Sequence, residues 1–404
     1  MADPVSSFTR PGFSDDAALD LQYLRALAGT PYGGAAPGEV LAVADRVRRR
    51  GGDRDTYIQA WAEQGRRVAA HAAEAFAAGR RATALSAYLR GYNYLRAAEF
   101  FIPAGRLEER RKLYEESVAQ FDAAVPLMPH PAEKISIPYA NGVTLPGYVF
   151  TVADDGRPRP TVVACGGVDG YGEEMYLLGG VPDALARGLN VVAFHGPGQR
   201  GLQLYHPELA FRPDAEVPLG AVVDCVADRP DVDEDRIALY GMSFGGYLAP
   251  RAAAHDERIK ALVANAPQRD LLGIVLGSGE RNDSSLMKEV KETRWGGPAF
   301  VENYLLWSNG AATLEAFAAQ ARHFTLEGLE QEITCPTLSI AAEGEIGVAT
   351  EQARQFHDAL RAPKHFATLA TADGADAHCG IGNLPHTSAL IYDWIAQQLG
   401  ENSG

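Results

Sequence analysis

One serine of this chain lies in a setting that could make it a nucleophile. Residues 241–245 read Gly-Met-Ser-Phe-Gly, with Ser243 at the centre. An apolar run at 237–240 comes directly before this pentapeptide, and a helix-forming run at 247–254 follows it. A tight strand-to-helix turn of this kind exposes the serine hydroxyl beside free helix N–H groups, which favour negative charge. The spacing predicts that Ser243 attacks a carbonyl, with an ordinary glycine turn as the alternative.

A serine hydroxyl needs a base near neutral pH, and the base needs a third group to orient it. In a site of this kind the chain order is serine, acid, histidine. His378 fits this order, because it lies in the glycine-rich segment 374–380, after the apolar run 366–369 and before a helix expected at 387–399. His386 lies nearer to that helix and is the weaker candidate.

The acid is expected in the loop after the apolar run 337–341, where two carboxylates compete. Counting back from a helix expected to start near Thr350 puts Glu345 in the acid position. Glu343 lies closer to the end of the strand and stays open as the alternative. The predicted catalytic residues are therefore Ser243, His378 and Glu345.

Acyl chemistry at a serine also needs two backbone N–H donors for the oxyanion. One is expected from Phe244, directly after the serine. The other is expected from the loop 166–170, Gly-Gly-Val-Asp-Gly, which follows the buried run 161–165. Val168 is the best-placed donor in this loop, and an ordinary glycine turn is again the alternative.

Short apolar runs alternate with helical segments over most of the chain. The strands expected from them are 161–165, 190–194, 237–240, 259–264 and 337–341, and a helix is expected at 173–187 between the first two. Such alternation predicts a parallel sheet covered on both faces. Ahead of it, residues 134–139 and 143–151 predict an antiparallel pair of strands that turns at Asn141-Gly142. With the serine setting, the pattern predicts an α/β-hydrolase fold whose doubly wound sheet is mostly parallel.

The chain is expected to divide into two domains near Pro131. Residues 1–130 predict a helical domain, and residues 131–404 predict the catalytic domain. Residues 268–334 lack a strand pattern and predict a helical cap inserted over the active site. The helices expected in the first domain are 16–27, 37–50, 55–79, 82–101 and 107–124. The tyrosines of the fourth helix predict a packing stripe, and the alternative is that Tyr92 or Tyr94 lines a pocket roof.

Composition narrows the classes of partner and compartment. The 404 residues, 46% of them hydrophobic, suit a globular chain with a large core. A net charge of −15 argues against nucleic acid and anionic membrane surfaces as partners. No run approaches the about 18 apolar residues that cross a bilayer, and residues 1–20 lack a signal-peptide pattern. Four scattered cysteines without metal spacing predict reduced thiols, so we expect a cytoplasmic protein with no metal and no organic cofactor.

Together these motifs resemble the serine hydrolases related to 2,6-dihydroxypseudooxynicotine hydrolase, and more distantly the FrsA-like esterases and fungal polyketide-shortening hydrolases. The resemblance covers nearly the whole chain. It is carried by residues 87–94, by 166–169 with Glu173-Glu174 behind them, and by 196–199, 241–246 and 377–379. One departure is the acid, since the family usually has aspartate where this chain offers Glu345.

The resemblance implies cleavage of a carbon–carbon bond next to a ketone in a 1,3-dicarbonyl or polyketide-like small molecule, through an acyl-enzyme. The alternatives are a carboxylesterase or thioesterase, or a biosynthetic acyl-transfer or acyl-elimination enzyme. A binding protein that lost catalysis is a fourth reading, against which the three competent side chains argue. The resemblance also implies a homodimer through the N-terminal helices. Separately, we expect a buried, largely apolar pocket in which Tyr92 or Tyr94, together with Asp169, contacts the substrate.

Overall fold

The computed structural model describes residues 8–276 and 300–400, and these form two compact units. The helical unit comprises residues 10–133 with 300–303. The sheet unit comprises residues 8–9, 134–276 and 304–400.

The helical unit is built from helices whose bounds lie within two residues of those expected from the apolar spacing. Asp16 caps the first by accepting the N–H of Ala18 at 2.8 Å, and Pro37 occupies the first turn of the second. Both are strong helix-start signals, because they satisfy or remove N–H groups that the first turn leaves free. The helices are α1 (Ala17–Ala28), α2 (Pro37–Arg49), α3 (Arg54–Ala77), α4 (Arg81–Glu99) and α5 (Leu107–Ala124).

Aromatic packing and one glycine hold α3 against α4. Trp61 on α3 is wholly buried among rings whose centroids lie 5.3 to 5.9 Å from its own. A Cβ added at Gly65 on α3 would lie 2.7 Å from Cγ of Leu95 on α4. The two helices therefore depend on a bare backbone at their closest approach. The rings around Trp61 are Tyr23, Tyr57 and Tyr94.

A buried ion pair joins α4 to α5. Arg110 Nε lies 2.5 Å from Glu99 Oε1, and neither side chain is exposed. Charges removed from water in this way are tolerated only while they compensate each other.

The sheet unit contains a single sheet that is mostly parallel, as predicted. Its order is β1-β2-β4-β3-β5-β6-β7-β8, with β2 antiparallel to β4 and each neighbouring pair from β4 through β8 parallel. The turn between β1 and β2 has positive φ at Asn141 (52°) and Gly142 (78°), which suits an Asn-Gly hairpin turn. The strands are β1 (Ala132–Pro138), β2 (Thr144–Phe150), β3 (Arg159–Cys165), β4 (Asn190–Phe194), β5 (Val232–Met242), β6 (Ile259–Asn265), β7 (Thr337–Ala342) and β8 (Lys364–Leu369).

Strand register brings the ends of distant segments together. Cys165 pairs with Gly241, Met242 with Asn265, and Ala342 with Leu369. These are the last residues of their strands or lie next to them, and parallel strands have their carboxyl ends at one edge. The loops that follow β3, β5, β6, β7 and β8 therefore meet at that edge, where ligands bind in open α/β sheets.

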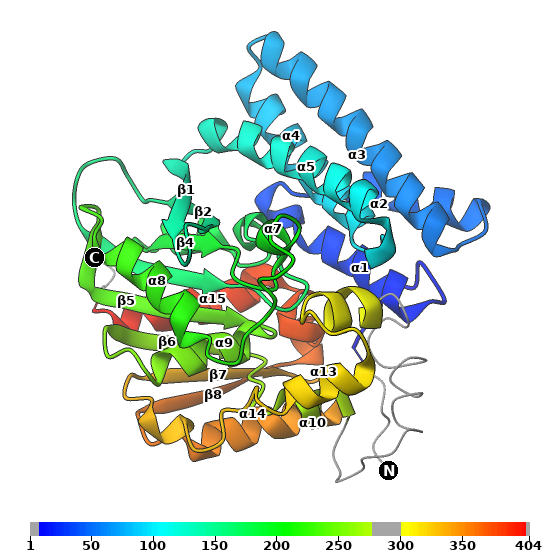
Figure 1. Ribbon diagram of the computed structural model, residues 1–404. Helices are drawn as coiled ribbons and strands as arrows, with labels where there is room; N and C mark the ends of the chain where they lie inside the picture. Colours follow the sequence, from blue (N-terminus) through cyan, green and yellow to red (C-terminus); the bar gives the residue numbers. More distant parts are fainter. Residues whose placement is uncertain (1–7, 277–299, 401–404) are drawn as a thin grey trace. The chain divides into compact units, whose positions relative to one another are not determined.

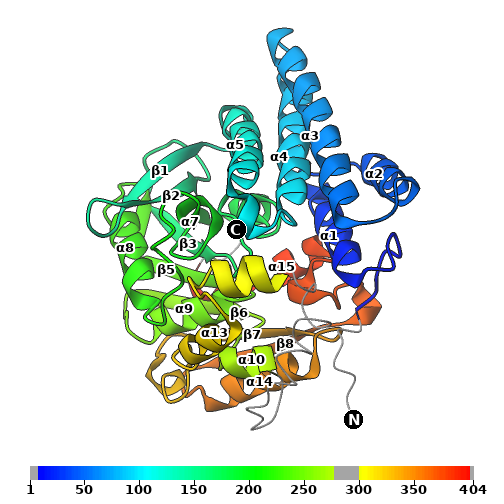
Figure 2. The same cartoon turned by 45° about the vertical axis from the view of Figure 1, so that its right-hand side comes forward.

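Helices cover both faces of the sheet (Figure 1). In that view α8 and α9 lie in front of the sheet and α15 lies behind it. The α10, α13 and α14 helices gather near β7 and β8 (Figure 2). The helices are α6 (Val181–Leu185), α7 (Arg200–Gln203), α8 (Glu216–Ala227), α9 (Gly245–Ala253), α10 (Leu271–Leu276), a π-helix (Val301–Trp307), α13 (Leu314–Ala321), α14 (Gly347–Ala359) and α15 (Leu384–Gln398).

Two elements differ from the sequence-based expectation. The helix expected at 173–187 is broken into a 3-10 turn (Glu173–Tyr176) and α6, because Gly180 adopts a left-handed φ of 66° between them. Strand β8 contains the apolar run 366–369, but only Leu369 of its residues is buried, as befits an edge strand. Of the expected cap at 268–334, residues 277–299 lie outside the described residues, and the described remainder is mainly helical.

Removing the carboxylate of Glu99 should destabilise the protein strongly. We expect Glu99→Ala to cost about 3–5 kcal/mol, because Arg110 then stays buried with its partner carboxylate deleted. Glu109→Ala removes an exposed partner of Arg106 and should cost less than about 1 kcal/mol. Urea denaturation followed by far-UV circular dichroism measures both. Equal losses in the two variants would contradict the role given to the buried pair.

Candidate active site

Ser243 lies in a strained turn between β5 and α9. Its φ is 60°, in the left-handed region that side-chain-bearing residues rarely adopt. Its N–H donates to the Asn265 carbonyl at 2.9 Å, and its carbonyl accepts from Gly246 N–H at 2.7 Å. A Cβ on Gly241 would strike the Gly245 carbonyl, and one on Gly245 would strike the Cys165 carbonyl. The glycines of the pentapeptide are therefore required by close backbone approach, and they leave the serine side chain half-buried at the sheet edge.

The three residues predicted as catalytic lie in one hydrogen-bonded row. His378 Nε2 is 2.8 Å from Ser243 Oγ, and His378 Nδ1 is 2.5 Å from Glu345 Oε1. A carboxylate only accepts hydrogen bonds, so the proton of the neutral ring lies on Nδ1. Nε2 is then free to accept the proton of the Ser243 hydroxyl. The Glu345 side chain is 6% exposed and that of His378 31%, so the row runs from the interior toward solvent.

The alternative acid and histidine make other contacts. The Glu343 carboxylate accepts the N–H of Thr371 at 2.7 Å. His386 Nε2 lies 4.0 Å from the Asp373 carboxylate, and the ring is largely exposed. The structure thus brings Glu345 and His378, rather than these two, to Ser243.

Asn265 ties the serine turn to the histidine loop. The residue is buried at the end of β6, and its Nδ2 donates to the Cys379 carbonyl at 3.1 Å. Its own carbonyl accepts the N–H of Ser243. Cys379 has a positive φ of 56°, so the histidine loop is also held in an unusual backbone conformation. The sequence analysis missed Asn265, although a polar residue at the end of the apolar run 259–264 was the available signal.

The pKa of His378 lies well above its ordinary value of 6.5. Burial disfavours the charged ring, but the neighbouring Cys379 sulfur and the Glu345 carboxylate favour it more. A proton taken from Ser243 is therefore held firmly on this ring. Conversely, the ring must lose its proton before it can act as a base, which requires a higher pH than for an ordinary histidine.

The predicted oxyanion donors lie on the two loops beside Ser243. Phe244 caps α9 directly after the serine. Val168 and Asp169 are half-buried in the loop after β3. In that loop a Cβ on Gly167 would lie 3.0 Å from Ser243 Oγ and 3.3 Å from the Phe244 nitrogen. The loop backbone therefore approaches both the nucleophile and the Phe244 N–H.

Two family models match the chain. The prolyl oligopeptidase family model matches residues 185–402, and the esterase FrsA-like model matches residues 47–274. The alpha/beta hydrolase psoB of Aspergillus fumigatus is 32% identical, covering 95% of this chain and 93% of its own length. This chain belongs to the α/β hydrolases. The 20-hydroxy-prefusarin hydrolase FUS2 of Gibberella moniliformis is 37% identical, covering 63% of this chain and 62% of its own length.

The fold of this α/β hydrolase also occurs in a solved structure. The crystal structure of 2,6-dihydroxy-pseudo-oxynicotine hydrolase superposes with a TM-score of 0.72, covering 93% of this chain and 96% of that one. The sequence identity is 20%, so the likeness shows the fold. The predicted α/β-hydrolase fold and the resemblance are confirmed by these matches.

Aromatic rings surround the nucleophile turn of the α/β hydrolase. Phe244 stacks on Tyr247 with centroids 5.5 Å apart, and Phe211 meets it edge-on at 5.0 Å. Phe324, which follows α13 in the expected cap segment, lies 5.8 Å from the same ring. The turn is therefore anchored by an apolar cluster that includes the segment after β6.

The two tyrosines predicted to contact substrate are buried in the helical unit. The Tyr92 ring packs on Phe121 at 5.2 Å. The Tyr94 hydroxyl donates to Glu39 Oε2 at 2.8 Å and accepts the Ala36 N–H at 2.9 Å. These contacts favour the packing interpretation, and a role at the substrate pocket stays a prediction.

Residues 8–276 and 300–400 are the part of the chain in which metal sites and membrane-spanning helices can be judged. No group of three or more His, Cys, Asp or Glu in this part of the chain could hold a metal ion. None of the helices described there combines the length and apolar character needed to cross a bilayer.

Glu345 and Glu343 offer a matched test of what raises the pKa of His378. Glu345→Gln should lower that pKa, because the neutral amide no longer stabilises the charged ring. Glu343→Gln, two residues away, should leave it unchanged. Titration of ring-labelled histidine by NMR measures both. If the pKa of His378 is the same in Glu345→Gln as in the wild type, this electrostatic role is refuted.

Proposed function

We propose that this α/β hydrolase cleaves a carbon–carbon bond next to a ketone in a 1,3-dicarbonyl or polyketide-like small molecule, through an acyl-enzyme on Ser243. The observation that carries the proposal is the row of hydrogen bonds from Ser243 through His378 to Glu345, 2.8 and 2.5 Å long. A nucleophile, a base and an orienting acid are the groups that acyl transfer needs.

The first half of the reaction forms the acyl-enzyme. Ser243 Oγ bonds to the ketone carbon while its proton moves to His378 Nε2. The carbonyl electron pair becomes an oxyanion, held by the N–H groups of Phe244 and Val168. Collapse of this intermediate re-forms the carbonyl and breaks the carbon–carbon bond, whose electron pair leaves on the second fragment.

The second half releases the products. In a 1,3-dicarbonyl compound, the neighbouring carbonyl delocalises the leaving electron pair as an enolate. The proton on His378 then neutralises the enolate, and the raised pKa of the ring keeps that proton available until the bond breaks. Water next attacks the ester on Ser243, again giving its proton to His378, and the carboxylic acid departs as Ser243 recovers its proton.

The bond that is cleaved distinguishes this proposal from a second candidate function. The match to the esterase FrsA-like model supports a carboxylesterase that uses the same row of residues. The relative named as a 20-hydroxy-prefusarin hydrolase supports a small organic molecule as substrate in either case. An ester's leaving alcohol needs no enolate stabilisation, so the two functions separate by substrate rather than by nucleophile.

The deciding experiment compares 1-phenylbutane-1,3-dione with phenyl acetate as substrates. We expect diketone cleavage to exceed ester cleavage, and Ser243→Ala to lower both by at least about 10⁴-fold. Ser339→Ala is the matched control, because Ser339 Oγ also contacts a histidine, His357, at 3.3 Å but is buried in β7. It should keep turnover within a few-fold of the wild type.

The outcomes of this comparison are distinct. Serine-dependent cleavage of the ester alone would replace the carbon–carbon proposal by the esterase. Turnover that persists in Ser243→Ala would remove both, because neither chemistry proceeds here without the nucleophile.

Filling the space between the two oxyanion loops should abolish turnover without unfolding the protein. In Gly167→Ala the new methyl group would lie 2.8 Å from Ser243 Cβ and 3.3 Å from the Phe244 nitrogen. We expect kcat to fall by about 10²-fold or more, as for loss of an oxyanion donor. Gly220→Ala on α8 meets no atom within 4 Å and should behave as wild type. Unchanged kcat in Gly167→Ala, from steady-state kinetics, would disprove the assigned geometry.

A further inference from the structure

We propose that Gln199 is a positioning residue that sets the direction of the Val168 N–H in the oxyanion hole. The inference rests on the function proposed above and assigns a role to the segment Gly196-Pro197-Gly198-Gln199. That segment follows β4 and does not include any residue of the hydrogen-bonded row.

The side-chain amide of Gln199 forms its hydrogen bonds with backbone groups. Its Oε1 accepts the N–H of Gly196 at 2.7 Å. Its Nε2 donates to the carbonyl of Gly166 at 2.9 Å and lies 3.3 Å from the carbonyl of Gly167. One amide thus connects the loop after β4 with the loop after β3. The side chain is 2% exposed, so these bonds form away from competing water.

Peptide planarity turns these bonds into a constraint on the oxyanion donor. The Gly167 carbonyl and the Val168 N–H belong to the same peptide unit, which is trans because the chain has no cis peptide bond among its described residues. In a trans unit the N–H points opposite to the C=O. The Gly167 carbonyl is held by Gln199 and by the Gly170 N–H, at 3.1 Å. The Val168 N–H is consequently directed away from Gln199.

Ser243 lies against Gly167, the residue directly before Val168. A Cβ built on Gly167 would meet Ser243 Cβ, Ser243 Oγ and the Phe244 nitrogen as its three nearest atoms. The carbonyls of Gly166 and Gly167 are therefore bonded to Gln199, while the Cα of Gly167 faces Ser243. If the peptide rotated, a carbonyl oxygen would approach the oxyanion and repel it.

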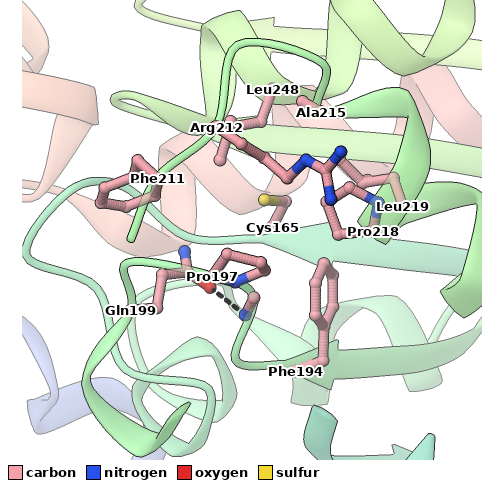
Figure 3. A pocket seen from close by; sticks show the side chains of 11 residues that line it. Cys165, Phe194, Pro197, Gln199, Phe211, Arg212, Ala215, Pro218, Leu219 and Leu248 are labelled. Carbon is pink, nitrogen blue, oxygen red and sulfur yellow. Dashed lines mark hydrogen bonds between the residues drawn. The ribbon is translucent and has the colours of Figure 1, made fainter. Parts of the chain in front are cut away.

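The support behind Gln199 is rigid. The segment forms a β-turn, closed by the Gln199 N–H to the Gly196 carbonyl at 3.0 Å, with Pro197 and then Gly198 at its centre. Gly198 has a φ of 80°, which matches a type II turn with proline and glycine in their preferred places. Gly196 and Gln199 are joined a second time by the hydrogen bond from the Gly196 N–H to the Gln199 side chain, which is drawn as a dashed line in Figure 3.

A small hollow lies beside this turn (Figure 3). Its walls are mostly apolar, so they provide few other partners for the amide of Gln199. They include Cys165, Phe194, Phe211, Pro218, Leu219 and Leu248.

The test replaces the amide and measures binding of an oxyanion mimic. Gln199→Met keeps the side-chain length but cannot donate to the two carbonyls. We expect kcat for phenyl acetate to fall about 10- to 100-fold, which is no more than the fall caused by removing an oxyanion donor. KM should change less than about 3-fold. Affinity for an aryl trifluoromethyl ketone, which forms an oxyanion on Ser243, should fall by a similar factor.

Gln352→Met is the matched control. Its amide makes the same kind of double contact with backbone, to the N–H and carbonyl of Asp270, both at 2.9 Å, and it is also buried. A general cost of deleting a buried amide would lower thermal stability in both variants, but only Gln199→Met should lose kcat and inhibitor affinity together. Gln199→Glu keeps an acceptor for Gly196 while losing the donor, and it serves with the same expectations where Gln199→Met fails to fold.

Two results would overturn the inference. In the first, the Gln199 variants have the same kcat and the same inhibitor affinity as Gln352→Met. The other is a loss confined to KM, which would place Gln199 in substrate binding instead. Failure of the proposed function is separate, since it shows as turnover that survives in Ser243→Ala whatever the Gln199 variants do.

Discussion

The left-handed backbone of Ser243 is the constraint on which the rest of the sheet edge depends. Such a conformation costs an L-residue about 1–2 kcal/mol, and it persists only where surrounding contacts hold it. Here the bare backbones of Gly241 and Gly245 let β5, α9 and the loop after β3 approach closely. The hydrogen bond from Ser243 N–H to Asn265 then fixes the turn against β6. The turn held in this way presents the Ser243 hydroxyl to His378, whose Nε2 lies 2.8 Å away.

Electrostatics at this edge follow from unequal burial along the row. Glu345 is almost hidden and His378 is partly open, so the carboxylate acts on the ring with little screening by water. Glutamate is one methylene longer than aspartate, and the loop after β7 accommodates this length while Glu343 bonds Thr371 instead. The raised pKa of His378 is thus a property of its neighbours, the Cys379 sulfur and the Glu345 carboxylate, and not of the histidine alone.

The sequence was most informative where chemistry and local pattern coincide. Ser243, Glu345 and His378 could be named because each follows an apolar run, and the topology of the fold orders them along the chain. The helices of the helical unit could be bounded because their apolar spacing is regular and α1 and α2 carry start signals. The acid could not be chosen with certainty, since two carboxylates stand two residues apart and only the folded loop separates their contacts.

What the sequence did not reveal depends on bonds between segments that are distant in the chain. Asn265 and Gln199 act through backbone carbonyls of other loops, and nothing in their own neighbourhood indicates which carbonyls those are. The extent of strand β8 was not evident from the apolar run 366–369 alone, because β8 is an edge strand in which only Leu369 is buried. The break between Glu173–Tyr176 and α6 depends on one glycine adopting a left-handed conformation, whereas the composition around it suits a helix.

The separation of Ser243 and His378, 135 positions along the chain, has a consequence for synthesis in the cell. A ribosome delivers the chain from its N-terminus, at about 5–20 residues per second. The strained serine turn and its neighbouring loop therefore leave the ribosome well before the histidine does. A growing chain therefore holds Ser243 before His378 can bond to it. If Ser243 acts as proposed, we expect copies that end before the loop after β8 to be inert toward acyl compounds.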